Sequence, residues 1–337
     1  MDHKISILVP VYGVEQYIEK CARSLFEQDY ENIEFVFVND CTIDRSEEVL
    51  LALIEHYPNR KGQIKIVRHE KNRGLVATRK TALANATGKF VMWVDSDDWI
   101  EPGSVKALIE KQEETNADIV SGSVWQITHT GKNVLITPEY QTREGMLEEI
   151  LKYNSYHICV WGKIIRLSLY EQFDIVTKDD CVYCEDWWVT SQIAYYASSA
   201  ASIPGFVYNY NCTNESSMVE LCHRHLKVDY WKQAVESCSF LVGFFKDKEP
   251  RWNEAAHKKS IQHLRNYYLH FAAEYAKPEL YSEILSFIQT EYHDYYSVIG
   301  WDNPVKRRFE SNYRLLSLFL RTRSFVNTQV KKVFKRE

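Results

Sequence analysis

The sequence lacks any apolar run approaching the roughly 20 residues that a helix needs to span a bilayer. It also lacks the basic segment, long apolar segment and small-residue cleavage site of a signal peptide, because the first residues lead directly into a short strand-like run, Ile5 to Val11. The eight cysteines are scattered, and several, such as Cys21 and Cys238, stand in apolar surroundings, which is typical of reduced thiols. We therefore expect a cytosolic protein.

Glycine-rich phosphate loops are missing as well. A dinucleotide-binding enzyme needs Gly-x-Gly-x-x-Gly after the first strand, where this chain has PVYGVE at 10–15, and the Gly-Lys-Ser/Thr of phosphate-loop ATPases is absent. The chain has no internal repeat and no low-complexity linker. With 337 residues, 45% apolar and 26% charged, it is expected to fold as one large domain or two modest ones.

The charge is unevenly distributed. The net charge is −5, yet residues 305–337 contain ten Lys or Arg and two acids, a local balance of +8, so the first 304 residues carry −13. An acidic protein with a basic tail is not typical of a nucleic-acid binder, and we expect no nucleic-acid partner.

The first hundred residues alternate between strand and helix patterns, which predicts an α/β fold with a parallel sheet and right-handed crossovers. Ligands of such sheets bind beyond the carboxyl ends of the strands. The expected strands are 5–11, 33–38, 64–67 and 90–94, and the expected helices between them are 14–28, 45–57 and 75–85.

A helix at 103–115, a strand at 118–127 and less regular segments are expected up to about residue 215. The pattern after residue 222 is mainly helical, which predicts a C-terminal helical region, 216–337, behind an α/β domain, 1–215. The expected helices there are 223–247, 253–276, 279–298 and 313–335.

The expected fourth strand ends at an acidic cluster, Asp95, Ser96, Asp97 and Asp98. Like charges this close need a cation, hydrogen-bond donors or a proton to compensate them, and Mg²⁺ or Mn²⁺ with phosphate oxygens would do so. The alternative is an acidic turn in which Asp97 or Asp98 caps the following helix.

Taken together, the strand ends resemble glycosyltransferase family 2, whose members have the GT-A fold, a Rossmann-like and mostly parallel sheet flanked by helices. The resemblance covers about residues 4–215. The matching stretches are 7–12 (ILVPVY), 38–44 (VNDCTID), 72–79 (NRGLVATR) and 93–99 (WVDSDDW), followed by 161–163 (WGK) and Glu185 with Asp186.

The resemblance implies two halves, 1–100 for a nucleotide diphosphate-sugar donor and 101–215 for the acceptor. Pro10, Tyr12 and Glu15 would line the base pocket, and Asp40 would hydrogen-bond the base edge. Arg79 would lie near the ribose or diphosphate. Asp95 and Ser96 would meet the nucleotide-sugar as well.

The resemblance also implies a metal-dependent, inverting sugar transfer. Asp97, with Asp95, would bind Mn²⁺ or Mg²⁺, and Asp186 would be the catalytic base with Glu185 as its neighbour. The acceptor would be a hydroxyl of a glycan or lipid-linked glycan, in the synthesis of a surface polysaccharide, capsule or lipopolysaccharide. From the residues alone, Glu185 and Asp186 could instead be the acids that favour the first turn of a helix, and both roles are compatible.

The chain departs from the common family pattern at several positions. Gly13 stands where Asn is frequent, and Asn39 and Cys41 replace an Asp and a Gly. Lys80 and Ala82 replace an Asn and a Gly. These departures leave two alternatives open, a GT-A-like binding or assembly module with little turnover, and another nucleotide-sugar enzyme such as a nucleotidyltransferase.

Three weaker signals have a structural alternative beside the functional one. Cys181 and Cys184 with Cys222, His223 and His225 could bind zinc or be unrelated thiols and surface histidines. His223 or His225 could also reach the catalytic metal. A group of aromatic residues could form a sugar platform or pack in the core: Trp161, Trp187, Trp188, Tyr208 and Tyr210.

The basic tail, 305–337, shows apolar residues at helical spacing flanked by Arg and Lys, which is typical of helices that lie on anionic membranes. It predicts contact with the inner face of the plasma membrane. The alternative is a helix packed on its own domain with a solvated basic face. The apolar positions are Leu315, Leu318, Phe319, Thr322, Val326, Val330 and Val333.

Overall fold

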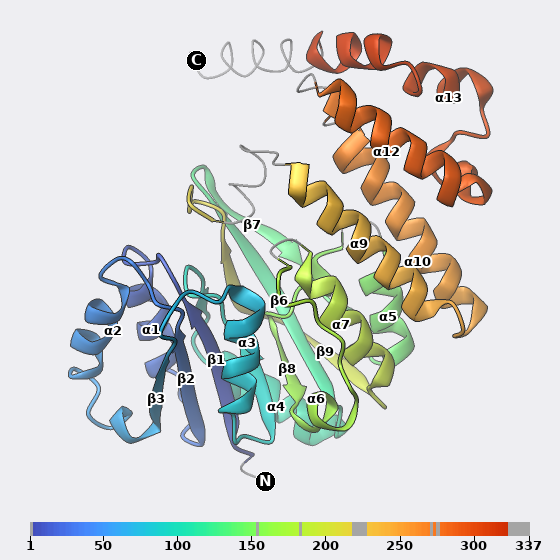
Figure 1. The fold of residues 1–337 in the computed structure, drawn as a ribbon. Helices are drawn as coiled ribbons and strands as arrows, with labels where there is room; N and C mark the ends of the chain where they lie inside the picture. The colour runs from blue at the N-terminus through green and yellow to red at the C-terminus, as the bar shows by residue number, and fades with distance from the viewer. Residues whose placement is uncertain are drawn as a thin grey trace, which may run out of the picture. The chain divides into compact units, whose positions relative to one another are not determined.

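The computed structural model describes residues 3–152, 155–181, 184–217, 228–269, 272–273 and 277–322. The chain forms two compact units, Met1–Ile150 together with Ser155–Leu226, and Leu151–Asn154 together with Lys227–Glu337 (Figure 1). None of the helices in these described ranges combines the length and apolar character that crossing a bilayer requires.

The described strands of the first unit form one nine-stranded sheet in the order β3-β2-β1-β4-β8-β6-β9-β5, with β7 paired to β6. The strands are β1 (Ile5–Val11), β2 (Ile33–Asn39), β3 (Ile64–Arg68), β4 (Phe90–Trp93), β5 (Trp99–Ile100), β6 (Ile119–Thr128), β7 (Gly131–Ile136), β8 (Lys163–Arg166) and β9 (Ala200–Asn211).

The four strands expected from the first hundred residues are all parallel, because β1 pairs with β2 and β4, and β2 pairs with β3. Every residue of β1 is buried, which explains why its sequence is an almost continuous apolar run. Beyond β4 the sheet is mixed. β8 is antiparallel to β4 and β6, β5 to β9, and β7 to β6, whereas β9 runs parallel to β6.

Helices flank this sheet (Figure 1). α3 packs on β1 and β2, α4 packs on β6 and β9, and α1 contacts α2 and β5. The helices of the first unit are α1 (Ile18–Phe26), α2 (Ser46–Ile54), α3 (Leu75–Ala84), α4 (Ser104–Thr115), α5 (Arg143–Leu151), α6 (Ser168–Gln172) and α7 (Glu185–Tyr196), with short 3₁₀ turns at Lys61–Gln63 (η1) and Tyr156–Ile158 (η2).

The short strand β5 matters for the site because it pairs with the end of β9. Trp99 is opposite Asn209, and Ile100 is opposite Tyr208. This pairing holds the loop after β4, residues 95–98, next to the residues that end β9. Two segments more than 100 positions apart in the sequence therefore meet at one edge of the sheet.

The second unit is helical and has its own core, in which Trp252, Tyr281 and Trp301 are almost fully buried. Its elements are α9 (Val228–Phe245), α10 (Pro250–His263), the π-helical turn η3 (Leu264–Leu269), α12 (Pro278–Glu291), the 3₁₀ segment η4 (His293–Ile299), α13 (Pro304–Glu310) and a further helix at 313–322.

The helix expected at 279–298 ends at Glu291, and the rest of that range is the 3₁₀ segment η4. The sequence analysis missed α13, although its signal is local. Asn303 caps it through hydrogen bonds from the backbone N–H groups of Val305 and Lys306, and Pro304 stands at its first position, where proline is favoured.

We predict that Gly88→Ala destabilises the first unit by about 1–3 kcal/mol. A Cβ at Gly88, just before β4, would lie 2.7 Å from the backbone N of Ser6 and 2.8 Å from the carbonyl O of Lys4, so β1 or the turn would have to shift. Gly62→Ala is the control, because its Cβ would meet nothing within 4 Å. Urea unfolding followed by circular dichroism measures both, and equal unfolding midpoints would contradict the predicted clash.

Candidate active site

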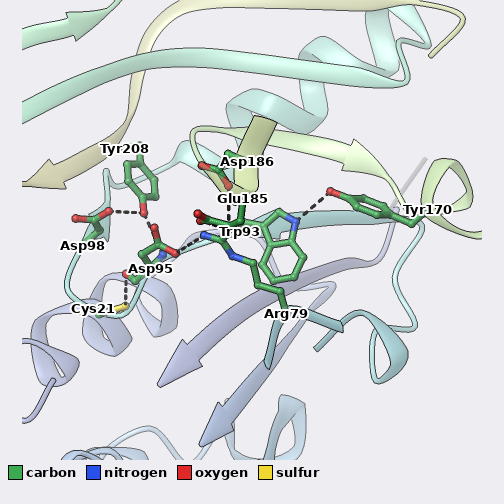
Figure 2. Close-up of polar contacts among 9 residues, drawn as sticks. All are labelled: Cys21, Arg79, Trp93, Asp95, Asp98, Tyr170, Glu185, Asp186 and Tyr208. Carbon is green, nitrogen blue, oxygen red and sulfur yellow. Dashed lines mark hydrogen bonds and ion pairs between the residues drawn. The ribbon is translucent and has the colours of Figure 1, made fainter. Parts of the chain in front are cut away.

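Arg79 lies at the centre of a buried acidic cluster (Figure 2). It is on α3, a helix preceded by Gly74, whose φ of 83° is in the region that glycine favours. The guanidinium donates from Nη1 to Asp186 at 2.9 Å and to Glu185 at 2.9 Å, and from Nη2 to Asp95 at 3.2 Å. One cation thus joins three carboxylates from two distant segments.

The charge of Arg79 is retained although its side chain is only 10% exposed. Burial disfavours the cation, but Asp186, Asp95 and Glu185 outweigh it and raise the pKa of Arg79. Its Nε atom is buried without a hydrogen-bond partner among the described residues. The guanidinium is therefore held by its two terminal nitrogens, through single contacts with three different carboxylates.

Glu185 and Asp186 begin α7, where the helix dipole favours negative charge. Burial raises the pKa of Glu185 to about 7, the Asp186 charge adds to the shift, and Arg79 opposes it. Burial also raises the pKa of Asp186, and Arg79 opposes that shift. The two side chains keep 14% and 15% exposure, so both still contact solvent. Both roles weighed for this pair, first-turn acids and a base of raised pKa, are compatible with this position.

The acidic loop after β4 is not a helix cap. α4 begins at Ser104, and the residue at its capping position is Gly103, which has no side chain to bind the helix. The capping alternative for Asp97 and Asp98 is therefore wrong. The loop has another partner, the end of β9.

Residues of β9 and the turn after it bind this loop. Tyr208 donates its hydroxyl to Asp98 at 2.7 Å and accepts the backbone N–H of Asp95 at 3.1 Å (Figure 2). The backbone N–H of Asn211 also donates to Asp98, at 2.7 Å. Asp98 is thus buried and satisfied by the protein, so its role is to hold the loop.

Asp97 differs from Asp98 because it is only partly buried. Asn214 donates its side-chain amide to Oδ2 of Asp97 at 2.7 Å. Burial, followed by the charge of Asp95, raises the pKa of Asp97 to about 6. This carboxylate is short of positive charge, as a cation-binding group would be.

The donor set around Asp95 and Asp97 fits a hard divalent cation, because carboxylate oxygens are the ligands that Mg²⁺ and Mn²⁺ prefer. Within the part of the chain that the structure describes, no group of three or more His, Cys, Asp or Glu side chains is assembled for a metal. A cation here would therefore need further oxygen ligands, such as substrate phosphates. For the zinc prediction, Cys181 and Cys184 are described, whereas Cys222, His223 and His225 lie outside the described residues.

The residues assigned to the base pocket lie at the ends of β1 and β2. Pro10 is buried in β1, and Tyr12, directly after it, is 45% exposed. Glu15 is exposed and accepts the backbone N–H of Arg45 at 2.9 Å. Ser96 is buried in the acidic loop. Tyr12 is thus the member of this set with a large accessible face.

Asp40 is 3% exposed and binds the chain itself. Its Oδ1 accepts the backbone N–H of Arg73 and its Oδ2 that of Gly74, both at 2.8 Å, and His69 contacts Oδ1 at 2.6 Å. In this structure Asp40 fixes the turn that starts α3, and so the helix that presents Arg79. The assignment to a base edge stays a prediction.

Three family departures have local explanations. Cys41 has φ 56°, so it keeps the positive φ that a glycine would adopt there. Asn39 accepts the backbone N–H of Thr42 at 2.8 Å and donates to Glu47. Its side chain therefore stabilises the turn after β2. Lys80 pairs with Asp179, in the segment before α7.

The aromatic group near the site is mainly core. Trp161 is 4% exposed and stacks on Tyr208, with ring centroids 5.1 Å apart, and on Tyr210 at 5.4 Å. Trp187 is buried too. Packing thus describes Trp161, Trp187 and Tyr208, whereas Tyr210 and Trp188 are partly exposed, and for these two the sugar platform stays a prediction.

Lys163 is a residue whose part the sequence analysis did not identify. It is 3% exposed, and its ammonium donates to the carbonyl groups of His157 at 3.3 Å, Trp161 at 3.1 Å and Cys159. Burial lowers its pKa to about 8, while the Cys159 and Asp186 charges oppose the shift. Lys163 is thus a buried cation that interacts electrostatically with Asp186 and stabilises the turn at 157–161 through hydrogen bonds.

Asn211 and Asn214 were also missed as parts of the site, and Tyr208 was expected only as a possible sugar platform, not as a partner of the acidic loop. The sequence offers one hint, a polar run at 211–217 after the alternating pattern 207–211. Their partners, however, are 110 to 117 positions away, a separation at which local periodicity carries no information.

Comparison with protein families gives a match for residues 6–173 to the family described as Glycosyl transferase family 2. The chain is 36% identical over 188 residues to glycosyltransferase GlyA of Streptococcus pneumoniae, covering 52% of this chain and 26% of that protein. It is 30% identical over 189 residues to the uncharacterized glycosyltransferase EpsJ of Bacillus subtilis, covering 54% and 53%. The chain thus spans about half or less of the length of these two relatives.

Solved structures show the same fold. TarS 1-349 of S. aureus in complex with UDP has a TM-score of 0.68 at 21% identity, covering 94% of this chain and 89% of that one. Its complex with UDP-GlcNAc has a TM-score of 0.67 at 21% identity, covering 85% and 81%. The mannosyltransferase PcManGT of Pyrobaculum calidifontis, in complex with GDP-Man and Mn²⁺, has 0.53 at 16% identity, covering 96% and 88%. These likenesses confirm the GT-A fold expected from the sequence.

The raised pKa of Glu185 predicts a pH dependence of stability. Its ordinary value is 4.5 and its value in the fold is about 7, so the folded protein binds this proton more tightly than the unfolded chain does. The free energy of unfolding should therefore fall as the pH rises through that window, by on the order of 3 kcal/mol, and should level off above it.

Glu185→Gln should remove the part of this dependence that Glu185 contributes, because the amide does not titrate, while Asp97 and Asp186, whose pKa values are also raised, should retain a part. Urea unfolding at about pH 5 and about pH 8 measures the difference, with Glu114→Gln, an exposed side chain, as the control. A Glu185→Gln variant as pH-sensitive as the wild type would show that Glu185 is not the group that takes up the proton.

Proposed function

Because the chain belongs to glycosyltransferase family 2, we propose that it is an inverting, metal-dependent glycosyltransferase. It would move a hexose or N-acetylhexosamine from a nucleotide diphosphate-sugar to a hydroxyl of a glycan or lipid-linked glycan. The observation that carries the proposal is the ion-pair cluster in which Arg79 joins Asp95 to Asp186. It brings the segment assigned to the donor next to the segment assigned to the acceptor.

Asp186 is the proposed base. In the reaction, the acceptor oxygen forms a bond to the anomeric carbon while the bond from that carbon to the diphosphate breaks. The acceptor hydroxyl loses its proton to Asp186 during the attack, because a neutral hydroxyl is a poor nucleophile. The raised pKa of Asp186 supports this role, since a more basic carboxylate accepts a proton more readily.

Arg79 would keep Asp186 deprotonated and able to accept a proton. Its contact with Asp186 is to Oδ1, so we assign proton acceptance to Oδ2. Without the guanidinium, Asp95, Glu185 and Asp186 would repel one another, which would favour the protonated forms of Glu185 and Asp186 further. An anionic diphosphate could also compete for Arg79, in line with its expected place near the ribose or diphosphate. Glu185 shares the same nitrogen and steadies the pair.

Asp97, together with Asp95, would hold Mn²⁺ or Mg²⁺. When bound, the cation would act as a Lewis acid that stabilises the leaving nucleoside diphosphate. Asn214 would keep Asp97 oriented toward that position. The raised pKa of Asp97 supports the assignment, because a cation would relieve the same shortage of positive charge.

The nucleotide would lie at the ends of β1 and β2. Tyr12 would offer its exposed ring to the base, and Pro10 and Glu15 would line the pocket. Asp40 would contact the base edge, and Ser96 the nucleotide-sugar. UDP is the preferred nucleotide, since the TarS structures with UDP and UDP-GlcNAc have the same fold.

The cellular setting follows from the acceptor class. We place the protein in the cytoplasm, working at the inner face of the plasma membrane where a lipid-linked acceptor would be presented. The pathway would be the synthesis of a surface polysaccharide, a capsule or a lipopolysaccharide. The opposing candidate, a binding or assembly module without turnover, is separated by the first experiment below.

Asp186→Asn should lower turnover at least about a hundredfold and leave nucleotide binding nearly unchanged, because it removes the proton acceptor and keeps the shape. The assay is slow hydrolysis of a panel of UDP-, GDP- and dTDP-sugars with Mn²⁺ and no acceptor, and calorimetry measures binding. Asp179→Asn, an exposed aspartate from the preceding segment, is the control. Turnover of no sugar by the wild type would favour the non-catalytic module, and full turnover by Asp186→Asn would refute the base assignment.

Asp97→Ala should lose the part of nucleotide binding that depends on metal. For the wild type, UDP affinity should rise at least about tenfold when Mn²⁺ is added, because carboxylates and phosphates share the cation. For the variant, calorimetry with and without Mn²⁺ should give equal affinities. An unchanged gain with Mn²⁺ in Asp97→Ala would show that the cation is held elsewhere.

A further inference from the structure

The helix at 313–322 has two apolar faces. At about 100° per residue, Leu316 and Leu320 fall on one side of the helix, Leu318 falls on the opposite side, and Leu315 and Phe319 lie next to Leu318. The first side is packed, since Leu316 and Leu320 are 2% and 9% exposed. On the second side Leu315 is 50%, Leu318 67% and Phe319 52% exposed. We call this second side the outer face.

The outer face consists of residues that the sequence analysis identified as the apolar stripe of the tail. The helix packs on its own unit through Leu316 and Leu320, as the structural alternative expects, and the ring of Phe319 lies 5.8 Å from that of Phe309, yet this part of the stripe stays largely exposed. Val326, Val330 and Val333 of the stripe lie outside the described residues. Exposed apolar side chains clustered on one helix face indicate a surface that binds something.

The exposed charges of this helix and of α13 are basic. Arg314 and Arg321 lie together on one flank of the helix, and α13, which precedes it, exposes Arg307 and Arg308. The one acid between residues 304 and 322 is Glu310, and it is withdrawn from the surface. Glu310 is 5% exposed and accepts hydrogen bonds from Arg265 and from the indole of Trp301.

The combination of exposed apolar side chains and exposed arginines indicates which kind of partner the outer face can bind. A second copy of the chain bound through the same face would bring two sets of arginines together without acids to pair them, which is unfavourable. An anionic bilayer provides apolar depth for Leu and Phe and negative headgroups for the flanking arginines. We propose that the outer face of helix 313–322, Leu315, Leu318 and Phe319 flanked by Arg314 and Arg321, binds the surface of an anionic membrane.

The test is co-sedimentation of the full chain with vesicles of phosphatidylcholine alone or with about one third phosphatidylglycerol. The wild type should pellet with the anionic vesicles, less so at high salt, and little with neutral ones. Leu318→Ser with Phe319→Ser should lower partitioning at least about tenfold. Arg314→Gln and Arg321→Gln should each lower it about fivefold on anionic vesicles.

The matched control is Leu51→Ser with Val134→Ser, two exposed apolar residues of the first unit, which should sediment like the wild type. All variants keep residues 323–337, so a change reports on the outer face. Circular dichroism checks folding, which substitutions of exposed side chains should preserve. Equal sedimentation of the Leu318/Phe319 variant and the wild type would overturn the proposal, and so would a wild type that does not pellet. Vesicle binding requires no turnover, so this proposal and the proposed activity fail independently.

Discussion

The buried guanidinium of Arg79 is the interaction on which the site depends. Asp95 is 16 positions from it in the sequence and Asp186 is 107 positions away, and both carboxylates would repel each other without it. Removing one partner from a buried charge cluster is strongly destabilising, whereas an arginine fork can satisfy several carboxylates at once. The same contact that offsets this repulsion also brings together the loop after β4 and the start of α7, the segments proposed to bind donor and acceptor.

A second set of contacts holds the acidic loop from the other side. Tyr208 and Asn211 satisfy Asp98, and Asn214 orients Asp97. The loop therefore has one carboxylate that holds the structure, Asp98, and another, Asp97, that is partly buried and has a raised pKa. Neighbouring acids of one short motif thus acquire different roles from their environments, as burial and hydrogen bonding differ over a few ångströms.

In the helical unit, too, one acid is buried and bound by the protein while the arginines near it in the sequence are exposed. Arg265 and Trp301 bind Glu310 inside the unit, which leaves arginines as the exposed charges of α13 and of the helix after it. An apolar face beside those arginines is costly in water unless it has a partner. A glycosyltransferase that works on lipid-linked acceptors would benefit from such a face, because membrane binding confines enzyme and acceptor to one surface.

By itself, the sequence determined the elements whose signals are local. The parallel strands β1 to β4 and the helices between them follow from apolar periodicity, and the ordered residues at the strand ends identified the family and its GT-A fold. Tertiary structure alone decided that Arg79 contacts Asp186, that Tyr208 and Asn214 hold the acidic loop, and which face of helix 313–322 is packed. The physical reason is the distance along the sequence over which each signal acts. Periodicity reports which side of an element avoids water, but a contact across more than 100 residues depends on how the sheet orders its strands, and no local pattern encodes that order.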